Sequence, residues 1–211
     1  MIRTIFFLLV FFFSNFFHFS YAAEIKPDPS KGQQLASQTC AACHALDGNS
    51  PGAANPKIAG QLPEYFYKQL VDFKPGKDKQ PAVRPSVMAI YAAPLSETAM
   101  QDLAAYFALQ TPKLSSAKNK NLTPLGQKVY RWGNPKTNVP ACAACHGVNG
   151  AGLPAQYPRL AGQFAEYTES QLKAFRSGER KNDPSKVMQT IAAKMTDQEI
   201  KAVSDYIAGL R

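Results

Sequence analysis

The sequence has few histidines, and all of its cysteines fall inside two short motifs. It contains three histidines and four cysteines in 211 residues. Beyond residue 22 only His44 and His146 are left, and each ends a Cys-Ala-Ala-Cys-His stretch. A structural zinc site needs four protein ligands, so neither motif alone completes one. A pair of ordinary disulfides would leave both histidines unexplained.

Alternating runs of β-branched residues are also scarce. A redox Cys-x-x-Cys pair is expected beside a βαβ pattern, and no such strands are visible. Apolar residues instead recur at spacings of three and four, which predicts helices. We therefore expect an all-α fold, with Thr196 and Glu199 forming a capping box. The expected helices cover residues 31–38, 63–73, 96–110, 125–132, 165–175 and 196–210.

Beyond residue 23 no apolar run is long enough to cross a bilayer. Residues 1–22 combine Arg3, an apolar run from Ile5 and small residues near Ala22, as in a secretory signal peptide cut after Ala22. An uncleaved membrane anchor is the alternative, because residues 5–23 are nearly long enough to span. Polar residues interrupt this run, which favours cleavage and export.

The chain contains an internal repeat. Residues 40–76 match residues 142–178 at an offset of 102, with 17 of 37 positions identical. One duplicated domain explains this pattern better than an array of short repeats. A polar, proline-bounded linker separates the copies. We expect one domain at residues 23–112, and the linker with a second domain at residues 113–211.

Each Cys-x-x-Cys-His motif places two sulfurs and an imidazole on one side of a helix. The cysteines are about one turn apart, and the histidine comes round to the side of the first cysteine. This arrangement suits one covalently bound haem c, held by two thioether bonds and by an imidazole on the iron. The predicted attachment residues are Cys40, Cys43, Cys142 and Cys145, and the predicted iron ligands are His44 and His146.

Methionine or an open position remains for the second axial ligand, because neither domain has a spare histidine. Met88 and Met188 occupy equivalent places in the repeat, in loops before the last helix of each copy. Met100 and Met195 are not equivalent to each other, and each fits a hydrophobic staple at a helix start. We therefore predict Met88 and Met188 as iron ligands and the other two as core.

Ligation by histidine and methionine has two consequences for function. The thioether sulfur favours ferrous iron and raises the reduction potential. It also fills the last coordination position, so no small-molecule substrate can bind there. The sequence thus predicts a carrier of electrons and not an enzyme.

The combination of motifs resembles the di-haem cytochrome c4 family. Two C-x-x-C-H copies lie about a hundred residues apart, each followed by P-x-[IL]-A-G-Q, by Q-L-x-x-F-x-x-G and by a loop methionine. The resemblance implies two class I cytochrome c domains related by a pseudo-twofold axis, with haem propionates facing across their interface. It also implies a periplasmic carrier, loosely associated with the membrane, between a quinol-oxidising cytochrome complex and a haem-copper oxidase.

The resemblance also assigns roles to single residues. It implies that the carbonyls of Pro56 and Pro158 accept the Nδ1 protons of the two motif histidines. Lys57 and Arg159 are candidates for propionate contact, although an ordinary solvated charge is equally compatible with the sequence.

The two copies differ in charge. Residues 23–112 carry 8 basic and 8 acidic side chains, whereas residues 113–211 carry 15 and 7. One interpretation is a basic face that docks on an acidic partner or an anionic membrane, and the other is simple solubilisation. The side chains considered for such a face are Lys173, Arg176, Arg180 and Lys181. Nucleic acid is not an expected partner.

Two other functions use the same residues. The chain could be the haem subunit of a dehydrogenase complex, such as a sulfide-oxidising flavocytochrome. A di-haem peroxidase is the second alternative, and it requires one iron with an open or displaceable position.

Tyr65 and Tyr167 recur in register within the repeat, and we expect them to serve in packing.

Overall fold

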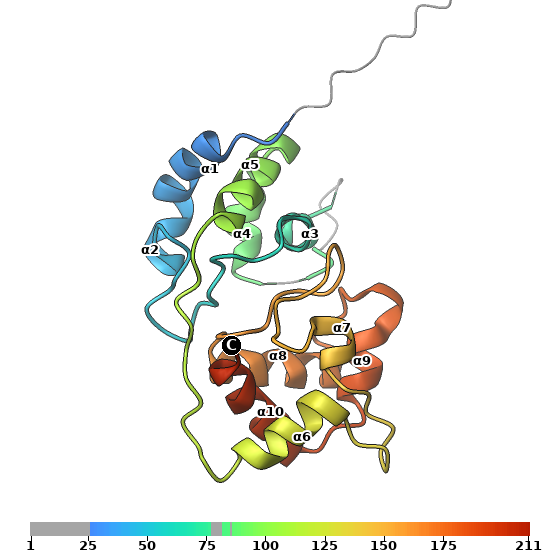
Figure 1. The fold of residues 1–211 in the computed structure, drawn as a ribbon. Helices are drawn as coiled ribbons and strands as arrows, with labels where there is room; N and C mark the ends of the chain where they lie inside the picture. The colour runs from blue at the N-terminus through green and yellow to red at the C-terminus, as the bar shows by residue number, and fades with distance from the viewer. Residues whose placement is uncertain (1–25, 77–81, 85) are drawn as a thin grey trace, which may run out of the picture.

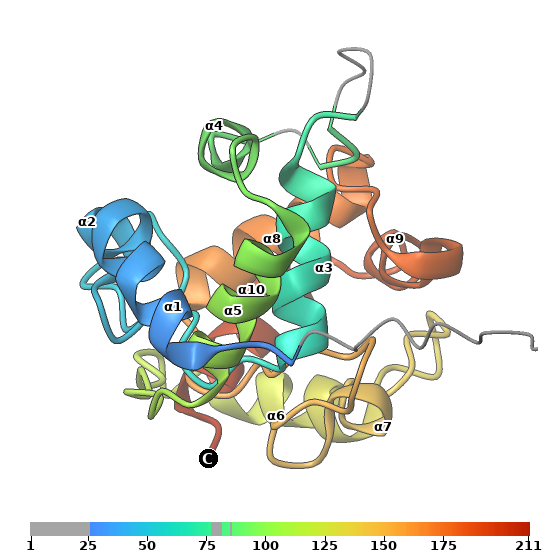
Figure 2. The same ribbon diagram turned by 90° about the horizontal axis from the view of Figure 1, so that it is seen from above.

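The computed structural model describes residues 26–76, 82–84 and 86–211, and its helices form two groups (Figure 1). The predicted signal peptide, residues 1–22, lies outside these described residues. Seen from above, the first group lies over the second (Figure 2). The described residues contain no strand and only two isolated β-bridges, so the all-α prediction is confirmed. None of the described helices combines the length and apolar character needed to cross a bilayer.

The order of helices repeats between the two halves. The first half contains α1 (Pro29–Leu35), the π-helical η1 (Ala36–Cys40), α2 (Ala41–His44), α3 (Pro63–Phe73), α4 (Met88–Ala92) and α5 (Glu97–Ala108). The second half contains α6 (Thr123–Trp132), α7 (Ala143–His146), α8 (Ala165–Ser177), the 3₁₀ turn η3 (Pro184–Lys186), α9 (Val187–Ala192) and α10 (Asp197–Gly209).

Each half is built on a crossing between its first and last long helices. α1 packs on α5 in the first half, and α6 packs on α10 in the second. Gly32 and Gly126 lie at these crossings, where an added Cβ would come within 2.1 Å of the Asp102 carbonyl oxygen and 2.2 Å of the Ala202 carbonyl oxygen. Only a residue without a side chain lets the backbones approach so closely. This explains why glycine occupies both positions of the repeat.

The last helix of each half starts at a side-chain cap. Ser96 Oγ accepts a hydrogen bond from the Ala99 amide at the start of α5. At the start of α10, Thr196 and Glu199 form the expected capping box, with both reciprocal hydrogen bonds present. The predicted starts of these two helices are therefore confirmed.

The structure differs from the sequence-based expectation at Met88 and Met188. Both residues were expected in loops, but Met88 begins α4 and Met188 lies in α9. These helices have five and six residues, which is too short to show a helical period in the sequence. Short helices have little stability of their own, and here they pack against α3 and α8.

The segment between the halves is tied to both of them. On the first half, the Lys113 amide donates to Asn49 Oδ1 over 2.6 Å. On the second half, the Lys118 and Asn119 amides donate to the Asp205 carboxylate over 2.8 and 3.2 Å. The polar composition of this segment is thus matched by specific hydrogen bonds along its length.

Candidate haem sites and the interface between the halves

The two Cys-x-x-Cys-His motifs occupy equivalent short helices, α2 and α7. Cys40 ends η1 and Cys142 is the N-cap of α7, while both histidines close their helices. His44 and His146 are buried, with 6% and 7% of their surface exposed. None of the four cysteines is paired in a disulfide. Each motif therefore presents two unpaired sulfurs beside one buried imidazole.

Both histidine rings are oriented by a proline carbonyl. His44 Nδ1 lies 2.9 Å from the Pro56 carbonyl oxygen, and His146 Nδ1 lies 3.0 Å from that of Pro158. A carbonyl oxygen only accepts, so Nδ1 must carry the proton and Nε2 keeps its lone pair. The contacts implied by the resemblance are thus present in both halves, and they leave Nε2 available to a metal.

The ionisation of the motif thiols argues against a redox dithiol. Burial raises the pKa of Cys40 to about 11 and that of Cys142 to about 12. These thiols stay protonated at neutral pH, unlike the low-pKa thiol of a redox dithiol. Burial lowers the pKa of both histidines, against the opposing effect of the proline carbonyls, which favours neutral imidazole. No cluster of three or more His, Cys, Asp or Glu suited to a metal occurs among the described residues.

The four methionines differ in burial. Met100 and Met195 are 2% and 5% exposed and belong to the two hydrophobic cores. Met88 and Met188 are only half-buried. Because the first two are enclosed by core side chains, the second two are the better candidates for a ligand outside the core. The assignment of Met88 and Met188 to iron stays a prediction.

Apolar side chains near the motifs and the two methionines are unusually exposed. Exposed apolar side chains that gather around one site, unlike single scattered ones, mark a surface that binds a ligand or partner. Two of these follow closely after His146 and three flank the methionines: Val148 (69% exposed), Leu153 (45%), Val87 (67%), Ile90 (73%) and Val187 (41%). A flat apolar group such as a porphyrin fits this distribution, because it would cover these side chains.

Arg159 supplies a second observation that fits haem. Its Nε is buried and has no hydrogen-bond partner among the described residues. A buried donor is rarely left unpaired, and a propionate is an acceptor of the right charge. Lys57 differs, because its ammonium group contacts the Lys113 carbonyl and lies 4.8 Å from the centre of the Phe164 ring. The structure thus separates two residues that the sequence treated alike.

The glutamine that ends each P-x-[IL]-A-G-Q motif forms hydrogen bonds with the other half. Gln61 Nε2 donates to the Arg159 carbonyl over 3.1 Å, and Gln61 Oε1 accepts from the Arg159 amide over 2.9 Å. Gln163 makes the equivalent pair with Lys57, over 2.8 and 3.0 Å. These four hydrogen bonds obey the expected pseudo-twofold relation. The role of the two glutamines was not predicted, although their repetition was visible.

Two arginines form the polar centre of the interface. Arg84 Nη2 donates to Gln171 Oε1 over 2.7 Å, and Arg180 Nη2 donates to the Tyr65 hydroxyl over 2.8 Å. Arg180 is only 8% exposed, so it cannot belong to the solvent-facing basic surface considered for docking. Tyr65 serves the interface through its hydroxyl as well as through packing.

Comparison with known proteins identifies the family. The family model for cytochrome c matches residues 29–109 and 125–211. The cytochrome c4 of Thiocapsa roseopersicina is 46% identical over 185 residues, covering 87% of this chain and 93% of the relative. The chain belongs to the cytochrome c4 family. It therefore carries two covalently bound haem c groups, and its activity is electron transfer and not enzymatic catalysis.

Two further similarities bear on fold and partner. The structure of reduced recombinant cytochrome c4 from Pseudomonas stutzeri has a TM-score of 0.81 at 39% identity, and the match covers 88% of this chain and all of that one. This match confirms the tandem two-domain fold. The thiosulfate dehydrogenase electron acceptor of Stutzerimonas stutzeri is 38% identical over 182 residues, covering 85% of this chain and 82% of the relative.

Proposed function

We propose that this member of the cytochrome c4 family is a periplasmic electron carrier, exported by residues 1–22, with its two haem domains at residues 23–112 and 113–211. The motif cysteines form the thioether bonds, and each iron has one histidine and one methionine ligand. The first site is Cys40, Cys43, His44 and Met88, and the second is Cys142, Cys145, His146 and Met188.

The observation that carries this proposal is the orientation of the two buried histidines. Each proline carbonyl holds its histidine in the tautomer that leaves Nε2 free, and the same geometry occurs in both halves. Bound haem iron supplies a one-electron ferric–ferrous couple. The protein orients the imidazole, encloses it and provides a thioether that favours the ferrous state.

For partners, we propose a quinol-oxidising cytochrome complex as donor and a haem-copper oxidase as acceptor, with loose association at the membrane surface. The charge excess of the second half supports docking on an acidic protein or an anionic membrane. Lys181 and Lys173 are exposed and remain candidates for this surface, although Lys173 pairs with Glu169. Arg180 is excluded because it lies in the interface.

A second candidate donor is a thiosulfate dehydrogenase. The relative from Stutzerimonas stutzeri bears the name of its electron acceptor and matches most of the length of this chain. This role keeps the same two haem sites and changes only the protein that reduces them.

The first experiment compares the two candidate donors. The oxidised holoprotein is mixed with quinol-oxidising complex and quinol, or with thiosulfate dehydrogenase and thiosulfate, and haem reduction is followed by stopped-flow absorbance. The proposed donor should reduce both haems at a rate that falls as salt increases.

Carbon monoxide supplies the check on ligation. Added to the fully reduced protein at neutral pH, it should leave the spectrum unchanged, because both axial positions are filled. Binding of carbon monoxide would contradict the ligand assignment and revive the peroxidase alternative.

A further inference from the structure

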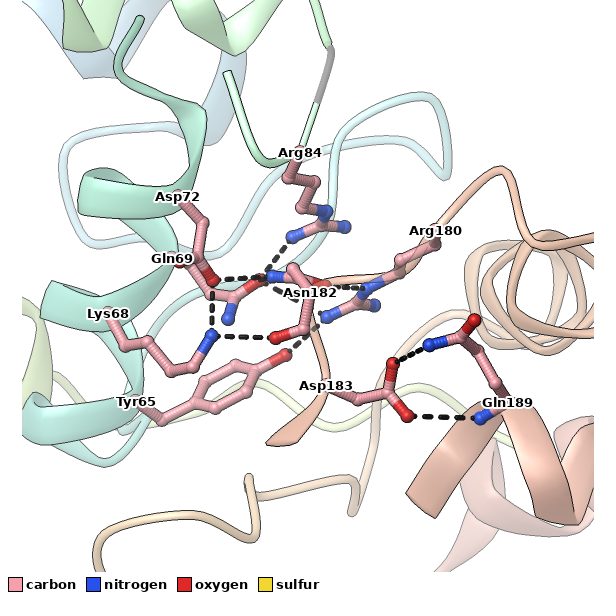
Figure 3. Close-up of polar contacts among 9 residues, drawn as sticks. All are labelled: Tyr65, Lys68, Gln69, Asp72, Arg84, Arg180, Asn182, Asp183 and Gln189. Atoms are coloured by element: carbon pink, nitrogen blue, oxygen red, sulfur yellow. Dashed lines mark hydrogen bonds and ion pairs between the residues drawn. The ribbon is translucent and has the colours of Figure 1, made fainter. Parts of the chain in front are cut away.

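The segment that leads to Met188 belongs to the second half, but its polar side chains bind α3 of the first half (Figure 3). The Arg180 guanidinium donates to the Tyr65 hydroxyl over 2.8 Å and to Gln69 Oε1 over 3.2 Å. It also lies 4.4 Å from the centre of the Phe175 ring in its own half. The guanidinium of Arg180 is thus buried between the two halves. The first half supplies two neutral oxygen acceptors for it, both on α3.

Asn182 is held by the same helix through side chain and backbone (Figure 3). Its Nδ2 donates to Asp72 Oδ2 over 2.7 Å and to Gln69 Oε1 over 3.0 Å. Its carbonyl accepts a hydrogen bond from Lys68 Nζ over 2.7 Å. Asn182 is 7% exposed and Gln69 is 8% exposed, so water competes little for these bonds.

The next residue transmits this fixed position to the methionine helix. The Asp183 carboxylate accepts from the Gln189 amide over 3.1 Å and from Gln189 Nε2 over 2.6 Å. Gln189 directly follows Met188 in α9. Hydrogen bonds therefore join α3 of the first half to Arg180 and Asn182, and the adjacent Asp183 is hydrogen-bonded to the helix that carries Met188.

We propose that α3 of the first half positions Met188 at the second haem, so that contacts made by one domain control how often the methionine of the other leaves its iron. This rests on the proposed ligand assignment. Loops that carry ligands open transiently, and the frequency depends on the bonds that opening must break. Opening of the Met188 segment breaks bonds to Tyr65, Lys68 and Asp72, none of which belongs to the second half.

The test reads the second haem alone. In a Met88→Ala background, the weak far-red absorption that marks an iron–methionine bond in ferric cytochromes comes only from the second haem. Imidazole competes with Met188 for that iron, and loss of the far-red band gives its affinity. Tyr65→Phe removes only the hydroxyl that accepts from Arg180, and it should raise the apparent imidazole affinity by about tenfold. Lys68→Met should act in the same direction.

The matched control lies on the same helix. Tyr67 donates its hydroxyl hydrogen bond to Glu97 over 3.0 Å, within the first half. Tyr67→Phe should leave the imidazole affinity of the second haem unchanged. Equal affinities in the Tyr65→Phe and Tyr67→Phe proteins, with thermal unfolding of both near that of the parent, would overturn the proposal.

Failure of the ligand assignment gives a different result. In that case the Met88→Ala parent would keep both far-red contributions or lose both, or the Met88→Ala/Met188→Ala protein would keep the contribution of the second haem, before any change on α3 is made. The role of α3 is therefore tested in a parent that passes these checks. If Tyr65→Phe then leaves the imidazole affinity of the second haem unchanged, only the influence of the first domain on Met188 is contradicted.

Discussion

At the scale of single residues, the haem sites depend on a few atoms. The roles of some of them can be predicted from the sequence, and the roles of others cannot. The spacing of cysteines and histidines is local, and it predicts that each motif lies on a helix, which agrees with α2 and α7. The hydrogen bond from His44 to Pro56 spans 12 residues and has no local signal, so only the family resemblance implied it. The unpaired Nε of Arg159 depends on burial, which sequence does not give.

The methionine assignment makes a prediction at this scale. Met88→Ala and Met188→Ala should each leave haem attachment intact and remove about half of the far-red absorption, because one of two irons loses its sulfur ligand. The affected haem should become high-spin, and its reduction potential should fall. Absorption spectroscopy and a redox titration measure these changes.

Met195→Ala is the matched control for these variants. It removes a buried side chain from the core of the second half and should lower the free energy of unfolding by about 2–5 kcal/mol. The far-red absorption should stay intact. Its loss in Met195→Ala, together with its retention in Met188→Ala, would show that the repeat was the wrong guide to the ligand.

At the scale of helices, the long elements followed from apolar spacing and capping residues, while the short ones did not. α5 and α10 have clear N-caps and enough turns to show a period. α4 and α9 are fixed by packing against α3 and α8, which is a tertiary effect. Sequence could place Met88 and Met188 in register, but it could not predict that they lie on helices.

The helix crossings make the second prediction. Gly32→Ala and Gly126→Ala should each lower the free energy of unfolding by about 1–3 kcal/mol, or more where the helices cannot separate. The reason is that the new Cβ would lie within 2.2 Å of a backbone carbonyl oxygen on the partner helix. Chemical denaturation followed by circular dichroism measures the effect.

Gly52→Ala provides the comparison for the crossings. No atom lies within 4 Å of a Cβ placed at Gly52, so this variant should unfold like the parent. If Gly32→Ala were as stable as Gly52→Ala, close packing of α1 on α5 would not explain the glycine.

At the scale of the whole molecule, the repeat encodes an interface as well as two haem sites. The shared letters at Gln61 and Gln163 could be read directly, but their partners lie 98 and 106 residues away. A single sequence shows that such positions recur without showing which residues they touch. Arg84 and Arg180 are not equivalent in register, although each guanidinium stacks on its own phenylalanine and donates to Gln171. No repeat alignment could pair them.

The interface predicts how the molecule unfolds. Replacing Gln61 and Gln163 together by alanine removes four hydrogen bonds between the halves, at about 1 kcal/mol each. The coupling between the halves should then weaken, although the hydrogen bonds of Arg84, Arg180 and Asn182 across the interface remain, and a single calorimetric transition should broaden or separate into two. Scanning calorimetry of the holoprotein measures this change.

Exposed glutamines at equivalent positions of the repeat serve as the control. Gln33 and Gln127 lie on α1 and α6 and face solvent. Their joint replacement by alanine should preserve a single transition. A split transition in this control would mean that the coupling does not depend on the interface glutamines.

The segment between the halves carries a final consequence. Its amides are bound to Asn49 on one side and to Asp205 on the other, and the interface glutamines hold the halves in one relative position. The gap between the two redox centres is therefore set by the fold and not by a diffusive search at the end of a tether. A more viscous solvent should therefore lower the rate of association with donor and acceptor, whereas the rate of electron transfer between the two haems should not change.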